Sequence, residues 1–129
     1  MRALVIDDSR TMRALLSRQL TRLGYEVLQA GDGEQALRVL EEAGDDPPVL
    51  ATVDWNMPVM DGLAFVQRVR PRKEWRSISL MMVTTESEHD QIVRALAAGA
   101  HEYLLKPFTP EAFVDKLQLL GLLPEGAPS

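Results

Sequence analysis

The sequence contains no cysteine in 129 residues. This absence excludes a disulfide framework and any cysteine-based metal or redox site, and it favours an intracellular, cytoplasmic protein. Long apolar runs are also missing. The start of the chain reaches two aspartates after only four apolar positions, which is far short of a signal peptide or a membrane span. We therefore expect no membrane segment.

Positive charge is in short supply, because 14 Lys and Arg face 19 Asp and Glu and leave a formal net charge of −5. Proteins that bind phosphate backbones use clustered basic residues, so direct nucleic-acid binding is disfavoured. The apolar fraction of 46% is ample for one core in a chain of this length. We predict one domain over residues 1–122 and a flexible tail over residues 123–129.

Short apolar segments alternate with amphipathic ones along the chain. The first, Ala3–Ile6, is too short for a helix and suits a strand buried on both faces. A helix follows, with Ser9 as its cap and Gly24 at its end, and Thr109 with Pro110 is typical of another helix start. The apolar stripe of the first helix consists of Met12, Leu15, Leu16, Leu20 and Leu23. The other predicted strands are 27–28, 49–53, 80–83 and 103–105, and the other predicted helices lie within 33–42, 63–69, 92–98 and 109–120.

This alternation predicts an α/β fold, a doubly wound parallel sheet of five strands with helices on both faces, in three layers. Such sheets bind ligands beyond the carboxyl ends of their strands. We expect one site at that edge, because polar side chains follow four of the predicted strands there. They are Asp7, Asp8, Asp54, Thr84, Thr85 and Lys106.

Carboxylates that converge on one edge repel one another unless a cation lies between them. Mg²⁺ suits such a site, because it takes one or two carboxylates, keeps several waters and binds a phosphate oxygen. Asp8 and Asp54 could supply the carboxylates. Lys106 adds a point charge, and Thr84 or Thr85 a hydroxyl donor, for phosphoryl oxygens. Since a carboxylate can accept a phosphoryl group covalently, Asp54 is the best-placed nucleophile.

Five short motifs mark this edge of the predicted sheet. They are Val5-Ile-Asp-Asp-Ser9, Asp54-Trp-Asn-Met-Pro58, Met60-Asp-Gly62, Met82-Val-Thr84 and Tyr103-Leu-Leu-Lys-Pro-Phe108. Together they resemble the receiver domains of response regulators, and most closely the stand-alone chemotaxis regulator of the CheY type. The resemblance covers residues 2–120. It implies a flavodoxin-like (βα)5 fold with strand order 2-1-3-4-5.

The resemblance also implies how the acidic residues act. Asp54 is then the residue that is phosphorylated. Asp8, Asp54 and the backbone carbonyl of Asn56 bind Mg²⁺ directly, and Asp7 helps through a water molecule.

A switch is implied on the same grounds. Lys106 and Thr84 would contact the phosphoryl group, the Thr84 hydroxyl would move toward it, and the Tyr103 side chain would turn inward behind it. The face formed by the helix around 92–96, the strand 103–105 and the last helix then changes its affinity for a partner. A cis peptide between Lys106 and Pro107 is part of the same pattern.

Residues outside this core set tune the lifetime of the phosphoryl group in the family. The combination of Asn56 and Glu86 resembles members that lose the group rapidly, so we predict a short-lived signal. Thr85 departs from the family pattern, where a smaller residue is common. Its extra bulk would slow the entry of a phosphodonor or of water.

The implied protein is a signalling switch with intrinsic phosphotransfer and autodephosphorylation activity, and not an enzyme that acts on a separate substrate. A histidine kinase would donate the phosphoryl group, and a downstream partner would read the switched face. Chemotaxis output is favoured, with a phosphorelay as the other option. We expect a monomer, with phosphorylation-dependent dimerisation as an alternative.

Two other functions fit part of the pattern. Phosphatases of the haloacid-dehalogenase type also combine an aspartyl nucleophile with Thr, Lys and Mg²⁺, but they carry a second acid where this chain has Asn56. A receiver that serves only as a docking module lacks some of the acidic residues or the lysine, and all are present here. We interpret His89 and His101 as solvated surface histidines, and Trp55 as a solvent-side neighbour of the site.

Overall fold

The computed structural model describes residues 1–85 and 89–124. Within these residues, strands and helices alternate along the chain, as the sequence predicts. The strands are β1 (Arg2–Ile6), β2 (Glu26–Ala30), β3 (Leu50–Val53), β4 (Ser79–Thr84) and β5 (Glu102–Leu105). The helices are α1 (Arg10–Arg22), α2 (Gly33–Ala43), α3 (Gly62–Val69), α4 (His89–Ala98) and α5 (Pro110–Leu119), with a 3-10 turn, η1 (Lys73–Trp75), before β4.

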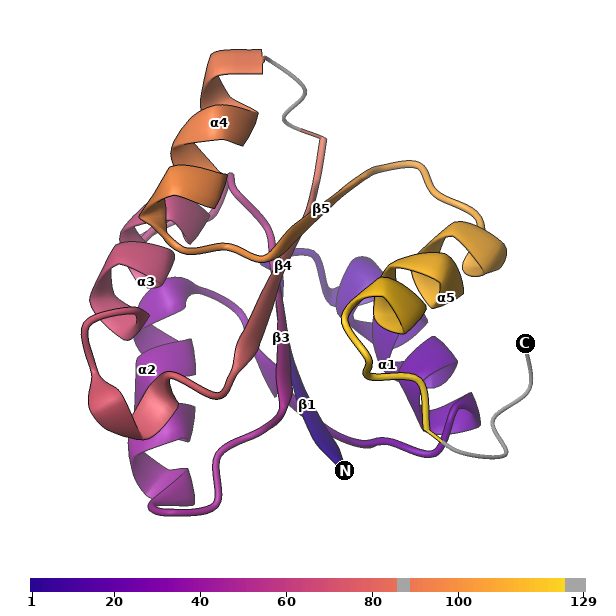
Figure 1. Ribbon diagram of the computed structural model, residues 1–129, viewed down its shortest axis with the longest axis horizontal. Helices are drawn as coiled ribbons and strands as arrows, with labels where there is room; N and C mark the ends of the chain where they lie inside the picture. Colours follow the sequence, from indigo (N-terminus) through magenta and orange to yellow (C-terminus); the bar gives the residue numbers. More distant parts are fainter. Residues whose placement is uncertain (86–88, 125–129) are drawn as a thin grey trace.

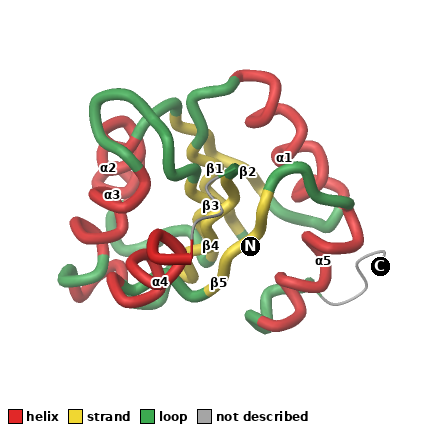
Figure 2. Tube along the Cα trace, turned by 90° about the horizontal axis from the view of Figure 1, so that it is seen from above, coloured by secondary structure: helices red, strands yellow, loops and turns green. Residues whose placement is uncertain are grey.

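The strands form one parallel sheet in the order β2-β1-β3-β4-β5. Helices α2, α3 and α4 cover one face of the sheet, and α1 and α5 cover the other (Figures 1 and 2). The predicted fold class, strand order and three-layer arrangement are confirmed. Every carboxyl end of a strand therefore points to the same edge, where ligands bind in sheets of this kind.

The central strands are buried on both faces, which explains their unbroken apolar runs. Along β1, Ala3 and Val5 join the core under α1 and α5, while Leu4 and Ile6 join the core under α2, α3 and α4. This alternation follows from the two-residue period of a strand. Because most side chains of these buried strands are apolar, the polar residues that follow the strands lie at the edge of the sheet.

Among the described residues, four helices begin with a side chain that accepts a hydrogen bond from the backbone N–H three residues later. These capping residues are Ser9, Asp32, Asp61 and Thr109. Each satisfies a donor that the helix leaves unpaired, which is worth about 1 kcal/mol. The predicted caps at Ser9 and Thr109 are confirmed, and Gly24 ends the first helical segment with a φ of 101°.

Two details of the helical and strand assignments differ from expectation. Leu15 is 40% exposed, although it shares the apolar spacing of its helix, because it lies at the margin of the buried stripe. The second strand is longer than the apolar pair 27–28 suggests, since it pairs with β1 along Glu26–Ala30. It is an edge strand, and its polar residues face solvent.

The end of the described chain packs on the domain. Leu122 and Leu123 contact the core under α1 and α5, and the Tyr25 hydroxyl donates to the Leu122 carbonyl. Residues 125–129 lie outside the described residues, so the predicted domain boundary and tail stay predictions. Among the described helices, none has the length and apolar character needed to cross a membrane.

Candidate functional site

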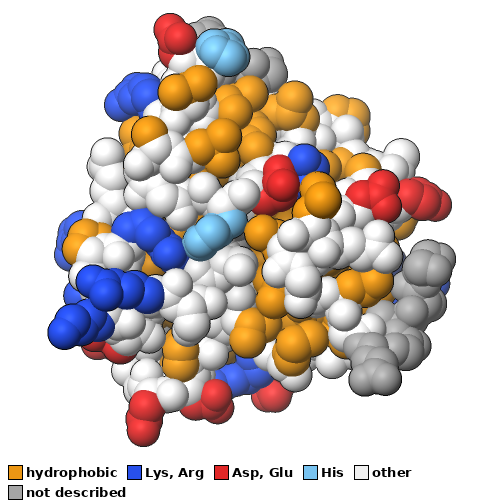
Figure 3. All heavy atoms as spheres, in the orientation of Figure 1, with side chains coloured by type: hydrophobic (Ala, Val, Ile, Leu, Met, Phe, Trp, Pro, Cys, Tyr) orange, Lys and Arg blue, Asp and Glu red, His pale blue; other side chains and the backbone are white. Residues whose placement is uncertain are grey.

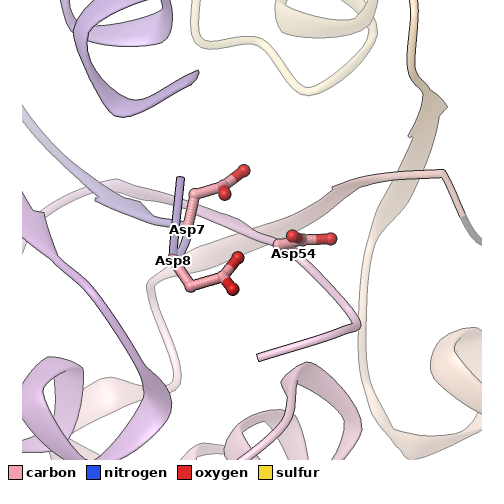
Figure 4. Close-up of side chains that lie close together, drawn as sticks. All are labelled: Asp7, Asp8 and Asp54. Atoms are coloured by element: carbon pink, nitrogen blue, oxygen red, sulfur yellow. The ribbon is translucent and has the colours of Figure 1, made fainter. Parts of the chain in front are cut away.

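Three carboxylates meet at the carboxyl ends of β1 and β3. Asp7 and Asp8 follow β1, and Asp54 follows β3 (Figure 4). The two strands are neighbours, with Ile6 opposite Val53, so the residues that follow them come out side by side. One oxygen from each carboxylate lies within 4.8 Å of the others. The predicted convergence of these acids on one edge is therefore observed.

A lysine crosses from the end of β5 to join the acids. The Lys106 Nζ atom lies 2.6 Å from Asp7 Oδ2 and 3.5 Å from Asp54 Oδ2. All three side chains are nearly buried, with exposures of 12%, 1% and 9% in that order. The Lys106–Pro107 peptide is cis, as the family resemblance implies. The ammonium group thus neutralises part of the negative charge at this edge.

Asp7 is the most strongly engaged of the acids. Besides Lys106, its Oδ1 accepts a hydrogen bond of 2.9 Å from the Ser9 backbone N–H. Its carbonyl accepts a bond of 2.6 Å from Arg13 Nη1. Asp8, in contrast, is exposed to solvent. Sequence reasoning missed Arg13, and its only signal was a basic residue in the helix after the acidic pair.

Asp54 combines burial with nearby charge. Burial raises the pKa of its carboxyl above the usual value, and the negative charge of Asp7 adds to the rise. A hydrogen bond from Thr84 and the positive charge of Lys106 act in the opposite direction. Burial is the largest of these effects. The ionised carboxylate is therefore costly to hold here, which favours binding of a further cation.

Thr84 ends β4 and is fully buried beside Asp54, whereas the next residue, Thr85, is exposed. Asn56 is also exposed, two residues beyond Asp54 in the loop after β3. Glu86, to which the family resemblance assigns a lifetime-tuning role, lies outside the described residues.

The loop between β3 and α3 is folded tightly over Asp54. The Gly62 N–H donates to the Trp55 carbonyl at 2.9 Å, and a Cβ at Gly62 would overlap the Asp54 carbonyl. At the tip of the loop, the Met60 N–H donates to the Pro58 carbonyl at 2.7 Å. The residue between them, Val59, has a φ of 68°. Glycine is thus required at 62 by close approach, which fixes the path of the loop.

Two aromatic residues lie near the site. Trp55 is only 8% exposed and belongs to the core under α2, α3 and α4, so its interpretation as a solvent-side residue was wrong. The loop folds back over it, which the residue types do not reveal. Tyr103 is half-buried in β5 opposite Met82 and packs against the same core.

The two histidines differ. His89 begins α4 and is exposed, in agreement with expectation. His101 is exposed too, as expected for a surface histidine, and its Nδ1 also accepts a hydrogen bond of 3.0 Å from the Leu80 N–H, a structural contact that the sequence does not reveal. The backbone N–H of His101 donates to the Leu80 carbonyl at 2.8 Å. Partial burial and the charge of Arg70 lower the pKa of His101 below its usual value.

The acidic residues fit a magnesium ion. Mg²⁺ binds oxygens at 2.0–2.1 Å, so ligands on opposite sides of one ion are about 4.2 Å apart. Asp8 and Asp54 each offer an oxygen no more than 4.8 Å from that of the other, close to this separation, and Asp7 offers a third oxygen within the same distance, near enough for a contact through water. The donors are all oxygens, as this hard cation prefers.

Known proteins resemble this chain over almost its whole length. Residues 3–118 match the model of the response regulator receiver domain. "Chemotaxis protein CheY1" of Helicobacter pylori is 45% identical over 121 residues, which cover 93% of this chain and 96% of the relative. "Chemotaxis protein CheY" of Pseudomonas aeruginosa is 35% identical over 92% of this chain and 94% of the relative.

Solved structures agree with the sequence relatives. The chemotaxis response regulator CheY4 of Vibrio cholerae superposes with a TM-score of 0.84 at 36% identity, and the match covers 92% of this chain and 97% of that one. The fold, the acidic edge and these similarities lead to one conclusion. The chain belongs to the family of response regulator receiver domains and is a CheY-like member of it.

Proposed function

We propose that the protein is a phosphorylation switch of a two-component system, in which Asp54 accepts the phosphoryl group of a phosphohistidine in a histidine kinase. One observation carries the proposal. Three carboxylates and Lys106 share one small region, with Lys106 Nζ 3.5 Å from Asp54 Oδ2. Such a set of charges is expensive to assemble and suits a dianionic group with its metal ion.

The proposed metal ligands follow from how each acid is engaged. Asp8, Asp54 and the backbone carbonyl of Asn56 would hold Mg²⁺ directly, because Asp8 is exposed and the ion approaches from solvent. Asp7 is already paired with Lys106, with 2.6 Å between Oδ2 and Nζ. This pairing supports a contact between Asp7 and Mg²⁺ through a water molecule. When bound, Mg²⁺ neutralises negative charge on the phosphoryl oxygens.

Phosphotransfer then needs positioning and little else from the protein. The N–P bond of the donor breaks as an Asp54 carboxylate oxygen bonds to phosphorus. Lys106 would contact a phosphoryl oxygen, and the Thr84 hydroxyl, which now bonds to Asp54, would turn to another. Both groups are nearly buried, so their interactions with developing charge are strong.

The signal would leave the site through β4 and β5. Thr84 lies opposite Leu105, and its carbonyl accepts a hydrogen bond of 2.9 Å from the Lys106 N–H. Two positions away in the same pair of strands, Tyr103 lies opposite Met82. A shift of Thr84 toward the phosphoryl group would leave room for Tyr103 to turn inward, which is the proposed switch.

We define the output face as α4, β5 and α5, and we propose that the partner protein binds there. Apolar side chains gather on it, above the open edge strand (Figure 3). Val93, Leu96 and Leu105 are each more than 40% exposed. Exposed apolar groups at a sheet edge are typical of protein docking sites. We propose that a chemotaxis partner binds this face, and that the protein itself is a cytoplasmic monomer, with dimerisation on phosphorylation as the alternative.

We keep the proposal of a short phosphoryl lifetime, tuned by Asn56, Thr85 and Glu86. Asn56 and Thr85 are both exposed, so water reaches the positions that flank Asp54. Retention of the phosphoryl group for hours with Mg²⁺ present would contradict the short lifetime, and would leave the switch itself standing.

The direct experiment supplies acetyl phosphate and Mg²⁺ and follows intact mass together with tryptophan fluorescence. We expect one phosphoryl adduct that requires Mg²⁺ and is absent in Asp54→Asn. A Trp75→Phe variant isolates the Trp55 signal, because Trp55 lies beside the acceptor. Multiple turnover of unrelated phosphomonoesters would favour a phosphatase, and a complete lack of adduct would favour a docking module.

A further inference from the structure

Basic residues are concentrated in one short segment, residues 68–76. It holds five of the 14 Lys and Arg and one of the 19 Asp and Glu, so it carries a charge of +4 while the rest of the chain carries −9. The segment spans the end of α3, the turn η1 and the approach to β4. It therefore lies at the amino end of β4, at the opposite end of the sheet from Asp54.

Arg70 holds this segment in place. Its guanidinium donates to the carbonyls of Arg76 and Ile78, at 3.4 and 2.7 Å. Its aliphatic stem lies against Gly99, where a Cβ would overlap it. Gly99 also has a φ of 121°, which favours glycine. Arg70 thus ties the segment to the start of β4 and to the end of α4.

Arg72 is used by the fold as well. Its guanidinium lies 4.1 Å above the ring of Trp75 and 3.0 Å from a carboxylate oxygen of Glu41 in α2. It also pairs with Glu74, the one acid of the segment. Glu74 is therefore paired within the segment, and Trp75 is buried, with 2% of its surface exposed.

Arg72 is exposed but paired with Glu41 and Glu74, and three further cations of the segment are exposed, namely Arg68, Lys73 and Arg76. Basic side chains gather on the α3 side of the molecule (Figure 3). The segment is held before any ligand arrives, so less ordering entropy is lost on binding. We define the basic patch as Arg68, Lys73 and Arg76.

We propose that the basic patch binds an acidic segment of a partner protein, at a site separate from the phosphorylation site and the output face. A short acidic peptide can pair with three clustered cations. A long polyanion such as nucleic acid would also meet the −9 charge of the rest of the chain. Single-stranded nucleic acid binds through exposed aromatic rings, whereas Trp75 is buried.

A membrane surface fits the patch less well. Helices and turns that bind membranes pair their basic residues with exposed apolar side chains that insert between lipids. Among the described residues from α3 to β4, none of the large apolar side chains is exposed. The partner can occupy the basic patch while Asp54 is phosphorylated, because the two lie at opposite ends of the sheet.

The test uses a fluorescent peptide of ten glutamates and measures its anisotropy with the full chain at low and at physiological salt. The triple variant Arg68→Gln, Lys73→Gln, Arg76→Gln should weaken binding by about tenfold or more. A matched triple variant, Arg10→Gln, Arg18→Gln, Arg22→Gln, makes the same change in net charge on α1, on the other face of the sheet. It should change binding by less than about twofold.

Acetyl phosphate labelling of both triple variants should equal that of the wild type, which separates this proposal from the proposed function. Equal loss of peptide binding in the two variants would overturn the proposal, since only net charge would matter. Failure of the wild type to bind the peptide at low salt would overturn it too. Tighter patch-dependent binding of a ten-nucleotide strand or of anionic phospholipid vesicles would replace the acidic peptide as the ligand.

Discussion

At the carboxyl end of the sheet, Asp7, Asp54 and Lys106 are nearly buried beside the exposed Asp8, whereas at the amino end of β4 a group of cations lies on the surface. The acidic end holds its charges close at a cost in stability. The basic end uses two of its cations, Arg70 and Arg72, to support its own fold. We therefore expect a ligand to stabilise the charges at the acidic end, whereas Arg70 and Arg72 at the basic end stabilise the fold itself.

At the acidic end, removal of Lys106 should cause the largest loss of stability. Lys106→Met leaves Asp7, which is 1% exposed, without its ion pair. We expect the free energy of unfolding at neutral pH without Mg²⁺ to fall by about 3 kcal/mol, as when one partner of a buried pair is lost. Chemical denaturation measures this. Added Mg²⁺ should recover part of the loss.

Lys116 supplies the control for that variant. Its Nζ lies 2.8 Å from Glu102, but both side chains are more exposed. Lys116→Met should cost less than about 1 kcal/mol. Equal losses in the two variants would show that the acidic end is not a special environment.

At the basic end, removal of Arg70 should cause the largest loss of stability. Arg70→Met keeps the aliphatic stem over Gly99 but loses the donors to Arg76 and Ile78. We expect the free energy of unfolding to fall by about 2 kcal/mol, because a charged donor to the part-buried carbonyl of Ile78 is lost. Arg68→Met, at an exposed position, should change it by less than about 0.5 kcal/mol. An unchanged Arg70→Met variant would mean that the basic end is not held by Arg70.

Removing the acceptor carboxylate sharpens the contrast, because it should stabilise the protein. The pKa of Asp54 is raised in the folded state, so the folded protein binds the proton more tightly than the unfolded chain does. The ionised group thus costs stability above the folded pKa, and this cost disappears as pH falls below the unfolded value. Asp54→Asn should raise the free energy of unfolding at neutral pH without Mg²⁺ by on the order of 1 kcal/mol.

The matched control is Asp61→Asn, which removes one negative charge from the same loop and keeps the cap on α3. It should change the free energy of unfolding by less than about 0.5 kcal/mol. Addition of Mg²⁺ should reverse the order of wild type and Asp54→Asn. A destabilised Asp54→Asn variant at neutral pH without Mg²⁺ would contradict the cost assigned to the acidic end.

The smallest effect concerns His101, beside Arg70. Its pKa is lowered below 6.5 in the folded state, so the unfolded chain binds its proton first as pH falls. The stability due to neutral His101 is complete above the unfolded value and is lost as pH falls from there toward the folded value. His101→Asn keeps an acceptor for the Leu80 N–H and does not titrate. The difference in unfolding free energy between the two proteins should therefore change with pH in that window, and a constant difference would contradict the assignment.

Local features of the fold were predictable from the sequence. Apolar runs gave the strands, and Ser9 and Thr109 marked helix starts, because these signals depend on neighbours in the chain. Long-range contacts were not predictable in the same way. The pairing of Lys106 with Asp7 joins residues 99 positions apart, and the bond between Leu80 and His101 depends on how a loop reaches a strand.

The acidic and basic ends of the sheet also differ in how much of each could be predicted from the sequence. The acidic residues could be placed on one edge, since each follows a strand of a parallel sheet. The five cations of residues 68–76 are plain in the sequence, but only the structure shows that two of them, Arg70 and Arg72, make contacts that support the fold. The burial of Trp55 likewise depends on the loop closing over it, which Gly62 makes possible.

The central claim is that Asp54 is the residue that accepts the phosphoryl group. Its most direct test is to treat the protein with acetyl phosphate and Mg²⁺, reduce the acyl phosphate with borohydride, and locate the resulting homoserine by peptide mass spectrometry. We predict homoserine at position 54 alone, with none when Mg²⁺ is withheld. Homoserine at Asp7 or Asp8 with Asp54 unchanged, or at no position, would contradict the account.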